Sequence, residues 1–263
     1  MAAKLLANSF KLATSDLANQ YALPVKSMTG YVVSKMTARK SKRLNELLIQ
    51  KHMNVTKDDF CLEIGYGRGD AIKLIFDRVS SGNGAVFGVE RSGYMDECTR
   101  KRFDLEIAET GQIRIDSTTD LRNLPYPNEI FDHIFHVDVF YFWRHEHLDE
   151  INREFLRVMK PGGSVHVGMQ FSRLESLTST NILDRSQWDP MRYLESLENA
   201  RFDDVQITYH NDTKIGEYQI ISAKRPSKSL DDEDADEILA QLAMDIKKER
   251  LAMAMLQKNG KID

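Results

Sequence analysis

The stretch CLEIGYGRGD, residues 61–70, places three glycines at alternate positions directly after a short apolar run. Glycine has no Cβ and adopts positive φ angles without strain, so a loop containing Gly65, Gly67 and Gly69 lets another molecule lie against the main chain. In an open parallel sheet, a loop that leads from a strand into a helix is where nucleotide-like ligands bind. The stretch therefore predicts an α/β domain with a ligand site at this loop.

Short apolar runs alternate with longer amphipathic stretches around the loop, which predicts alternating strands and helices. The predicted strands cover 60–64, 85–90, 112–116, 132–137 and 164–169, and the predicted helices cover 41–51, 70–79, 93–107, 146–159 and 187–199, the first of them capped by Ser41. This order indicates βαβ units and a mostly parallel, Rossmann-like sheet. Two further runs, 204–209 and 216–224, predict an antiparallel hairpin at the end of the sheet.

The composition divides the chain into three parts. We expect an N-terminal helical cap at 1–55, the ligand-binding α/β domain at 56–226, and an acidic linker with a C-terminal helix at 227–263. The linker holds six acids in the eight residues LDDEDADE, which favours a solvated segment. Apolar residues at 239, 242 and 246 form a stripe on the predicted helix that could dock on the domain or on a second copy, so a homo-oligomer is possible.

Charge and cysteine content exclude several other classes of protein. The chain has 36 Lys and Arg against 40 Asp and Glu, so its net charge of −4 provides no general attraction to nucleic acid or to an anionic membrane. The basic cluster at 39–43 is interpreted as a solvated helix face rather than an RNA site. Only Cys61 and Cys98 occur, and no apolar run approaches the roughly 18 residues of a membrane span. A cytoplasmic protein is expected, with mitochondrial import as the alternative because residues 1–20 are amphipathic and nearly free of acids.

The spacing of the glycines distinguishes between two classes of ligand. A dinucleotide site has the pattern GxGxxG, but Asp70 occupies the position of the third glycine in this sequence. An acid at the start of a helix also repels a diphosphate. S-adenosylmethionine (SAM) carries no phosphate and avoids this repulsion. The spacing favours SAM, with a nicotinamide-dependent oxidoreductase as the alternative.

Four segments in order resemble one known family, the class I SAM-dependent methyltransferases of the methyltransferase type 11 group. LEIGYGRG is similar to motif I of that family, GVERS to the end of its second strand, LPYPNEIFDHI to the approach to its fourth strand, and EFLRVMKPGGSV to the approach to its fifth. The lead-in TGYVVSKMTARKSKRLNELLI also resembles the helical segment of some bacterial members. The resemblance covers about residues 27–223 and implies the class I methyltransferase fold, SAM as cofactor and methyl transfer as the activity.

The resemblance also implies which residues contact the cofactor. Glu90 would accept hydrogen bonds from both ribose hydroxyls, because a carboxylate offers two acceptor oxygens. Asp116 would accept the adenine amino group, with Asp120 as the alternative, and Glu63 would help to fix the methionine end. The full predicted cofactor set is Glu63, Gly65, Tyr66, Gly67, Gly69, Glu90, Arg91, Asp116, Ser117 and His136.

The end of the fourth predicted strand holds the candidate catalytic residues. His136, Asp138 and Tyr141 lie where this fold brings a substrate to the methyl group, and strand alternation predicts His136 and Asp138 on the same side. His136 could act as a general base, or it could be a buried residue that closes the strand. The predicted function is methyl transfer to an oxygen or nitrogen of a small molecule, with a non-catalytic scaffold as a further alternative. The pair His145 and His147 lacks the spacing of a zinc site.

Overall fold

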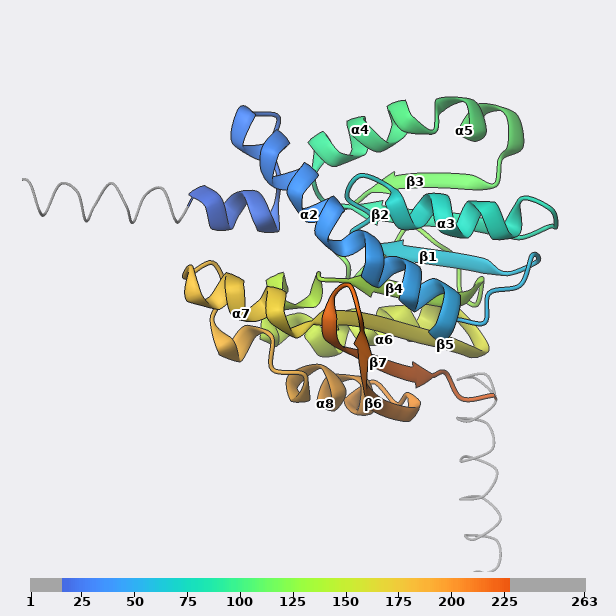
Figure 1. Ribbon diagram of the computed structural model, residues 1–263. Coiled ribbons are helices and arrows are strands. Elements are labelled where there is room, and N and C mark those ends of the chain that lie inside the picture. Colours follow the sequence, from blue (N-terminus) through green and yellow to red (C-terminus); the bar gives the residue numbers. More distant parts are fainter. Residues whose placement is uncertain (1–15, 228–263) are drawn as a thin grey trace, which may run out of the picture. The chain divides into compact units, whose positions relative to one another are not determined.

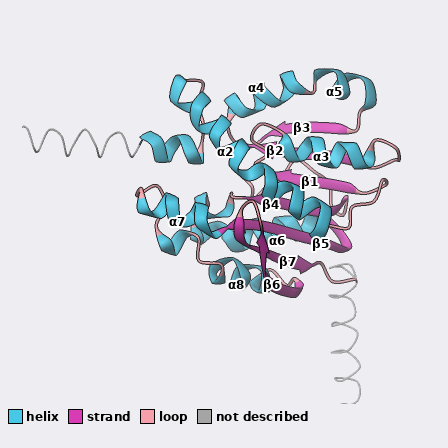
Figure 2. Ribbon diagram, in the orientation of Figure 1, coloured by secondary structure: helices cyan, strands magenta, loops and turns pink. Residues whose placement is uncertain are grey.

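The computed structural model describes residues 16–227, which contain one seven-stranded sheet (Figures 1 and 2). The strand order is β3-β2-β1-β4-β5-β7-β6. The strands are β1 (Phe60–Ile64), β2 (Ala85–Glu90), β3 (Ile113–Ser117), β4 (Phe131–Val137), β5 (Met159–Gln170), β6 (Asp203–Asp212) and β7 (Gly216–Lys224). β1 to β5 pair in parallel, and β7 pairs antiparallel with both β5 and β6. The predicted mostly parallel sheet with a C-terminal antiparallel hairpin is confirmed.

Helices cover both faces of the sheet. They are α2 (Met28–Leu47), α3 (Asp70–Val79), α4 (Gly93–Arg102), α5 (Asp104–Thr110), α6 (Leu148–Val158), α7 (Phe171–Ser179) and α8 (Met191–Asn199), and α2 continues into a π-helical turn at Leu48–His52. α2 and α3 lie together in front of the strands in Figure 1, and α6 packs with α8 on the other side. Residues 16–22 form a helical segment before α2.

The central strands are apolar because both of their faces are covered. Residues 61–64 of β1 are all buried, and their neighbours across the sheet come from β2 and β4. The carboxyl ends of β1, β2 and β4 therefore meet at one edge, at the point where the chain order reverses from β1-β2-β3 to β4-β5. That edge is where an open α/β sheet binds its ligand.

Three predicted element boundaries were wrong. The helix expected to begin at Ser41 begins at Met28, because the hydroxyl of Ser27 accepts a hydrogen bond from the Gly30 amide at 3.0 Å and caps it there. Ser41 lies inside the helix. The helix predicted at 93–107 divides at Phe103, whose side chain is buried. β5 begins at Met159, five residues earlier than predicted, and α7 was not predicted.

The chain divides into two units between Arg225 and Pro226. Apart from residues 226 and 227, the second unit lies outside the described residues, and so do the predicted acidic linker and C-terminal helix. Most of the predicted amphipathic segment at 1–20 lies outside them too. Across residues 16–227, every helix is too short or too polar to cross a lipid bilayer.

The burial of His136 predicts a loss of stability at acid pH. Burial lowers the pKa of this imidazole to about 3, whereas an unfolded histidine has a pKa of about 6.5. Below pH 6.5 the unfolded chain therefore binds a proton that the folded chain does not, and the free energy of unfolding falls as pH falls. We expect this residue to cost about 2 kcal/mol at pH 5 relative to neutral pH.

Urea unfolding of the wild type and of His136→Gln at pH 7.5 and pH 5 measures this term. The variant should lose less stability between the two pH values than the wild type, and His145→Gln, at an exposed position, should behave like the wild type. Equal losses in the wild type and in His136→Gln would contradict the assignment.

Candidate functional site

The loop from Gly65 to Gly69 turns three times through the left-handed region. Gly65, Gly67 and Gly69 have φ angles of 75°, 52° and 78°. A Cβ on Gly65 would lie 2.9 Å from Val139, and one on Gly69 would lie 2.7 Å from Phe103, so packing within the protein requires both glycines. A Cβ on Gly67 would have no neighbour within 4 Å. The bare backbone at Gly67 therefore faces open space.

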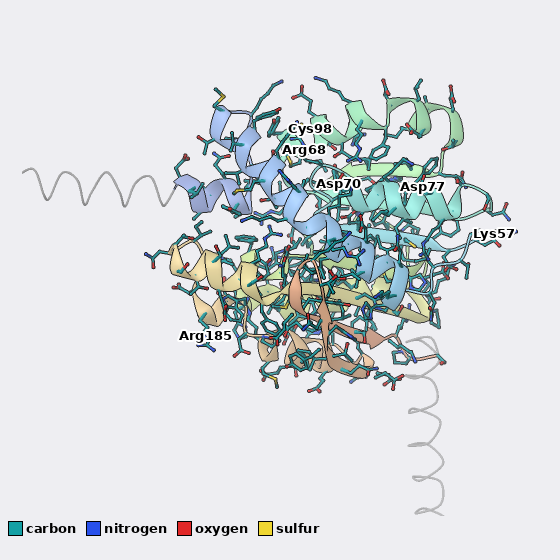
Figure 3. The ribbon with its side chains drawn as sticks, in the orientation of Figure 1. Lys57, Arg68, Asp70, Asp77, Cys98 and Arg185 are labelled. Carbon is teal, nitrogen blue, oxygen red and sulfur yellow. The ribbon has the colours of Figure 1, made fainter. Side chains whose placement is uncertain are left out.

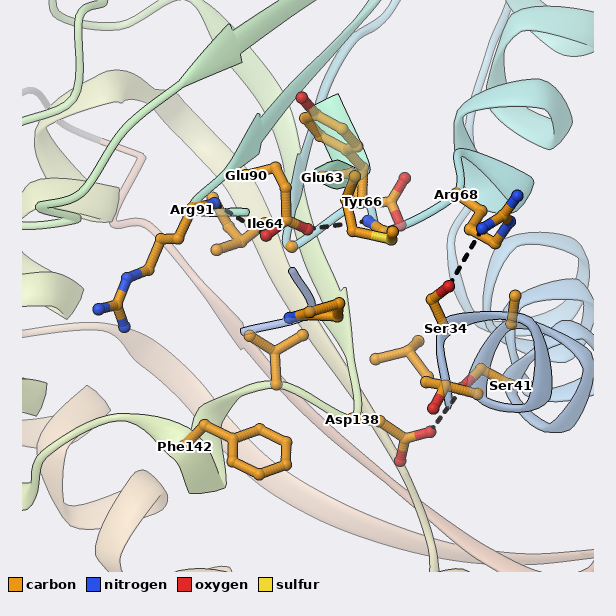
Figure 4. A pocket seen from close by; sticks show the side chains of 18 of the residues that line it. Ser34, Ser41, Glu63, Ile64, Tyr66, Arg68, Glu90, Arg91, Asp138 and Phe142 are labelled. Carbon is orange, nitrogen blue, oxygen red and sulfur yellow. Dashed lines mark hydrogen bonds between the residues drawn. The ribbon is translucent and has the colours of Figure 1, made fainter. Parts of the chain in front are cut away.

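That space is a cavity at the carboxyl ends of β1, β2 and β4, with about 1040 Å³ of empty volume including its open mouth (Figure 4). Residues 21–24 and α2, which we call the cap, form another wall of the cavity. The polar and charged lining residues are Tyr21, Ser34, Thr37, Ser41, Asn45, Glu63, Tyr66, Arg68, Asp70, Glu90, Arg91 and Asp138. The cavity is thus formed by the glycine loop, three strand ends and the cap.

Glu90 organises the backbone around the loop. Its Oε2 accepts a hydrogen bond from the Gly67 amide at 3.0 Å, and its Oε1 accepts from the amides of Arg91 and Ser92 at 2.8 and 2.9 Å (Figure 4). Burial raises the pKa of this carboxyl, and the three amides act against that rise. Because a carboxylate has about four acceptor positions, one remains for a ligand hydroxyl.

Glu63 lines the cavity with an unsatisfied oxygen. Its side chain is buried, and Oε2 has no hydrogen-bond partner among the described residues. Burial, followed by the negative charges of Asp70 and Glu90, raises the pKa of Glu63 to about 8. A cationic ligand group at Oε2 would satisfy this oxygen and stabilise its charge. The amino group of SAM provides such a cation, so the residues present fit this cofactor.

Tyr66 and Arg68 point to opposite sides of the loop. The Tyr66 hydroxyl donates to Asp96 at 2.8 Å, and its ring is buried against Gly88, so Tyr66 contributes mainly backbone to the cavity. Arg68 donates to the hydroxyl of Ser34 in α2 at 3.1 Å (Figure 4). Figure 3 shows Arg68 and Asp70 together at the start of α3. The loop and the cap are thus joined by a hydrogen bond.

One face of α2 contributes a polar wall that sequence reasoning missed. Ser34, Thr37, Ser41 and Asn45 follow at intervals of three and four residues, so they share one side of the helix, and all four line the cavity. Thr37 Oγ1 and Asn45 Oδ1 are buried and have no hydrogen-bond partner among the described residues. The helical spacing of these polar residues is the signal that could have revealed the wall.

Asp138 lines the cavity at the centre of a buried cluster. Its carboxylate accepts hydrogen bonds from the hydroxyls of Ser41 and Tyr141, both at 2.8 Å, and forms a salt bridge with Arg173. Burial, followed by the charge of Asp138, raises the pKa of Tyr141. Tyr141 and Arg173 lie behind Asp138 and do not line the cavity. Of the three predicted catalytic residues, only Asp138 reaches the cavity.

The prediction that His136 and Asp138 lie on the same side was wrong. β4 ends at Val137, and Asp138 has a φ of 61°, which breaks the strand alternation. His136 is completely buried against Trp143 and Tyr193, with Nε2 at 2.9 Å from the Tyr193 hydroxyl, and it does not line the cavity.

The predicted adenine residues lie away from the main cavity. The carboxylate of Asp116 accepts from Arg114 and from the Tyr126 hydroxyl, both at 2.9 Å, and neither Asp116 nor Ser117 lines the cavity. Leu121 does line it, and its neighbour Asp120 borders an adjoining hollow that shares Arg91 and Leu121 with the cavity. In residues 16–227 no group of three or more His, Cys, Asp or Glu side chains is arranged to hold a metal ion.

Comparisons with known proteins agree with this fold. Residues 62–167 match the family model of a methyltransferase domain. Geranyl diphosphate C-methyltransferase from Streptomyces coelicolor A3(2), solved with Mg²⁺, geranyl diphosphate and S-adenosyl-L-homocysteine, is similar with a TM-score of 0.55 and 17% identity, over 78% of this chain and 86% of that chain. A search of curated proteins found no significant match to the sequence.

Two further solved structures share the fold. Phosphoethanolamine N-methyltransferase 2 from Haemonchus contortus has a TM-score of 0.57 and 13% identity, over 81% of this chain and 60% of that chain. A methyltransferase in complex with the Haloferax volcanii Trm112 activator has a TM-score of 0.57 and 18% identity, over 73% and 95%. Residues 62–167 thus match a methyltransferase domain, and the chain has the fold of class I SAM-dependent methyltransferases, which confirms the predicted resemblance and is consistent with SAM as the cofactor.

The raised pKa of Glu63 predicts that cofactor affinity depends on pH. Because an ammonium group binds the deprotonated carboxylate, SAM binding below about pH 8 should release a proton, and affinity should rise about tenfold per pH unit towards pH 8. Calorimetry in two buffers of different ionisation enthalpy measures the proton release. Glu63→Gln cannot release this proton, so its affinity should be lower and its pH profile flat. An equal slope in both proteins would refute the role of Glu63.

The open space at Gly67 predicts that a side chain there blocks the cofactor. Gly67→Val should abolish SAM binding in calorimetry, because the valine would occupy the space in front of the loop. Gly111→Val is a matched control, since Gly111 also has a positive φ, 66°, and an open Cβ position but lies between α5 and β3. Both variants bear similar backbone strain. If both variants lost a comparable amount of SAM affinity, misfolding rather than a blocked site would explain the effect.

Proposed function

We propose that the protein transfers the methyl group of SAM to an oxygen or nitrogen atom of a small molecule. The observation that carries this proposal is the polar wall of α2, where Thr37 Oγ1 and Asn45 Oδ1 have no hydrogen-bond partner within residues 16–227 and the wall lines the same cavity as the glycine loop. Buried polar groups without partners are costly, so these two atoms are suited to bind a polar ligand. The names of two similar structures, which describe methyl transfer to geranyl diphosphate and to a phosphoethanolamine, support a small acceptor.

Different residues of the cavity are proposed to contact different parts of SAM. Glu63 is proposed to bind the amino group, and Glu90 the ribose, through its remaining acceptor position. For the adenine end we favour Asp120 and Leu121 over Asp116 and Ser117, because Leu121 lines the cavity and the Asp116 carboxylate already has two partners. The glycines contribute backbone and space.

Asp138 is proposed to orient the acceptor. Its carboxylate has about four acceptor positions, and Ser41, Tyr141 and Arg173 occupy three of them. One position remains for an O–H or N–H of the acceptor. Because Arg173, Ser41 and Tyr141 hold the carboxylate of Asp138 in place, its remaining oxygen position is suited to anchor the acceptor.

Orientation explains methyl transfer with few demands on the protein. SAM supplies an electrophilic methyl group, so a nucleophile held in line with it reacts without covalent catalysis. The new O–CH3 or N–CH3 bond forms as the S–CH3 bond breaks, the neutral thioether S-adenosylhomocysteine leaves, and the acceptor proton is released to solvent. His136, the predicted base, has a pKa near 3 and lies outside the cavity wall, so we favour placement by Asp138 over base catalysis by His136.

The proposal is tested by product analysis. The full chain is incubated with SAM and fractionated metabolite pools, and S-adenosylhomocysteine is measured together with acceptors that gain one methyl group. Turnover that requires the protein and is absent in Gly67→Val supports the proposal. SAM binding without S-adenosylhomocysteine in any pool would favour the non-catalytic scaffold.

Variants at the end of β4 separate the two catalytic models. With a confirmed acceptor, His136→Gln should retain wild-type kcat and an unchanged pH profile, because a buried imidazole outside the cavity cannot accept the substrate proton. Asp138→Asn should lower kcat/KM about 10- to 100-fold, the usual value of a hydrogen bond to a charged group, with unchanged SAM affinity. A kcat loss of about 100-fold in His136→Gln would restore the base mechanism.

Because Asp138→Asn leaves the buried Arg173 without a counter-charge, its fold needs a separate check. The double variant Asp138→Asn/Arg173→Met removes both charges. It should regain thermal stability relative to Asp138→Asn while keeping the low kcat/KM.

A further inference from the structure

The cap exposes an unusual number of large apolar side chains. Of the eight exposed large hydrophobic residues in the described part of the chain, five lie between residues 23 and 32: Leu23, Val25, Met28, Tyr31 and Val32. Met28 is 84% exposed and Val32 is 55% exposed. Clustered exposed apolar residues mark an interaction surface more often than isolated ones do.

The same surface continues into a row of cations. Lys35, Arg39, Lys40 and Lys42 are exposed, and none of them has an acidic partner among residues 16–227. The only acid in α2 is Glu46, which pairs with Arg43. This surface is therefore strongly positive, although the whole chain carries a net charge of −4.

Helical geometry brings the two groups together. Met28, Tyr31, Lys35, Arg39 and Lys42 follow one another at intervals of three and four residues, and Val32 lies four residues after Met28, so the six form one outward stripe on α2. The adjoining face of the helix is the polar wall of the cavity. The segment before α2 also has both kinds of residue. Tyr21, Ala22 and Pro24 line the cavity, whereas the side chain of Leu23 is exposed.

We propose that this cap surface, the exposed residues 23–32 together with the cations at 35–42, docks on an anionic phospholipid bilayer. Apolar side chains beside unpaired Lys and Arg are the features of helices that lie in a membrane interface, where the apolar groups enter the headgroup region and the cations attract anionic lipids. Tyr31 is the single aromatic in the cluster, which disfavours single-stranded nucleic acid, where stacked aromatics dominate. Two copies of the surface would repel each other because both are positive.

Docking by this surface brings α2 to the bilayer, and the adjoining face of the same helix lines the cavity. We expect the cavity to lie close to the headgroup region and to receive molecules that leave it. An amphiphilic acceptor fits this arrangement. This last consequence rests on the proposed methyl transfer, whereas the docking itself does not.

The test is vesicle flotation with the full chain. Vesicles of phosphatidylcholine alone are compared with vesicles in which about one third of the lipid is phosphatidylserine, at low and at high salt. We expect binding to the anionic vesicles that weakens with salt. Lys35→Gln/Arg39→Gln/Lys42→Gln should weaken it about 100-fold, because each cation near the surface contributes about a factor of five. Met28→Gln/Val32→Ser should weaken the part of the binding that persists at high salt.

A control variant carries the same loss of charge elsewhere. Lys57→Gln/Arg153→Gln/Arg201→Gln changes three exposed cations outside the cap. Figure 3 shows Arg68 near the start of α3 and Lys57, which precedes β1, near the opposite end of that helix. This variant should bind vesicles as the wild type does. All variants should keep the wild-type melting temperature and SAM affinity, which separates a failure of docking from a failure of the proposed function.

Three results would overturn the inference. The first is that the wild type does not bind anionic vesicles. The second is that the control variant loses as much binding as the cap variants, since the attraction would then be non-specific. The third is that the cap variants change the sedimentation of the protein or its binding to a single-stranded RNA while vesicle binding stays constant, because the surface would then serve a second copy or a nucleic acid.

Discussion

The buried carboxylate of Asp138 connects the segments that enclose the cavity. It accepts from Ser41 in α2 and from Tyr141 after β4, and it pairs with Arg173 in α7. A buried ion pair adds little net stability, because desolvation offsets much of the attraction, but removing one partner is strongly destabilising. Any arrangement that separates these segments would leave a charge unpaired. The position of the cap over the sheet edge depends on this constraint.

Acidic side chains dominate the electrostatics around Glu63. Asp70 and Glu90 lie close enough to raise the pKa of Glu63, although Asp70 also pairs with Arg102, and the nearby Arg68 is directed to Ser34 rather than to these acids. The ammonium group of SAM would offset the negative charge at Glu63. The acids thus select for a cation, and this preference is consistent with the exclusion of a diphosphate by Asp70.

Local patterns predicted the part of the structure that depends on local sequence. The predictions of the strand at 60–64, of the glycine loop and of α3 were correct, because the apolar run, the spacing of the glycines and the start of the helix all lie within twenty residues. The side of the sheet reached by Asp138 was not predictable, because its φ of 61° breaks the strand alternation and two of its partners, Ser41 and Arg173, are distant in the sequence. Ser41 was wrongly predicted to cap a helix, because its hydrogen-bond partner, Asp138, is 97 residues away in the sequence. The contacts of Asp116 with Tyr126 and Arg114 were likewise not predictable, because no rule of residue spacing contains them.

The hydrogen bond from Arg68 to Ser34 joins the floor of the cavity to its roof. The bond joins segments that lie 34 residues apart in the sequence, so the two walls of the cavity are coupled through it. A movement of α2 away from the glycine loop would break this contact, and the width of the cavity between the two walls therefore depends in part on a single side-chain pair.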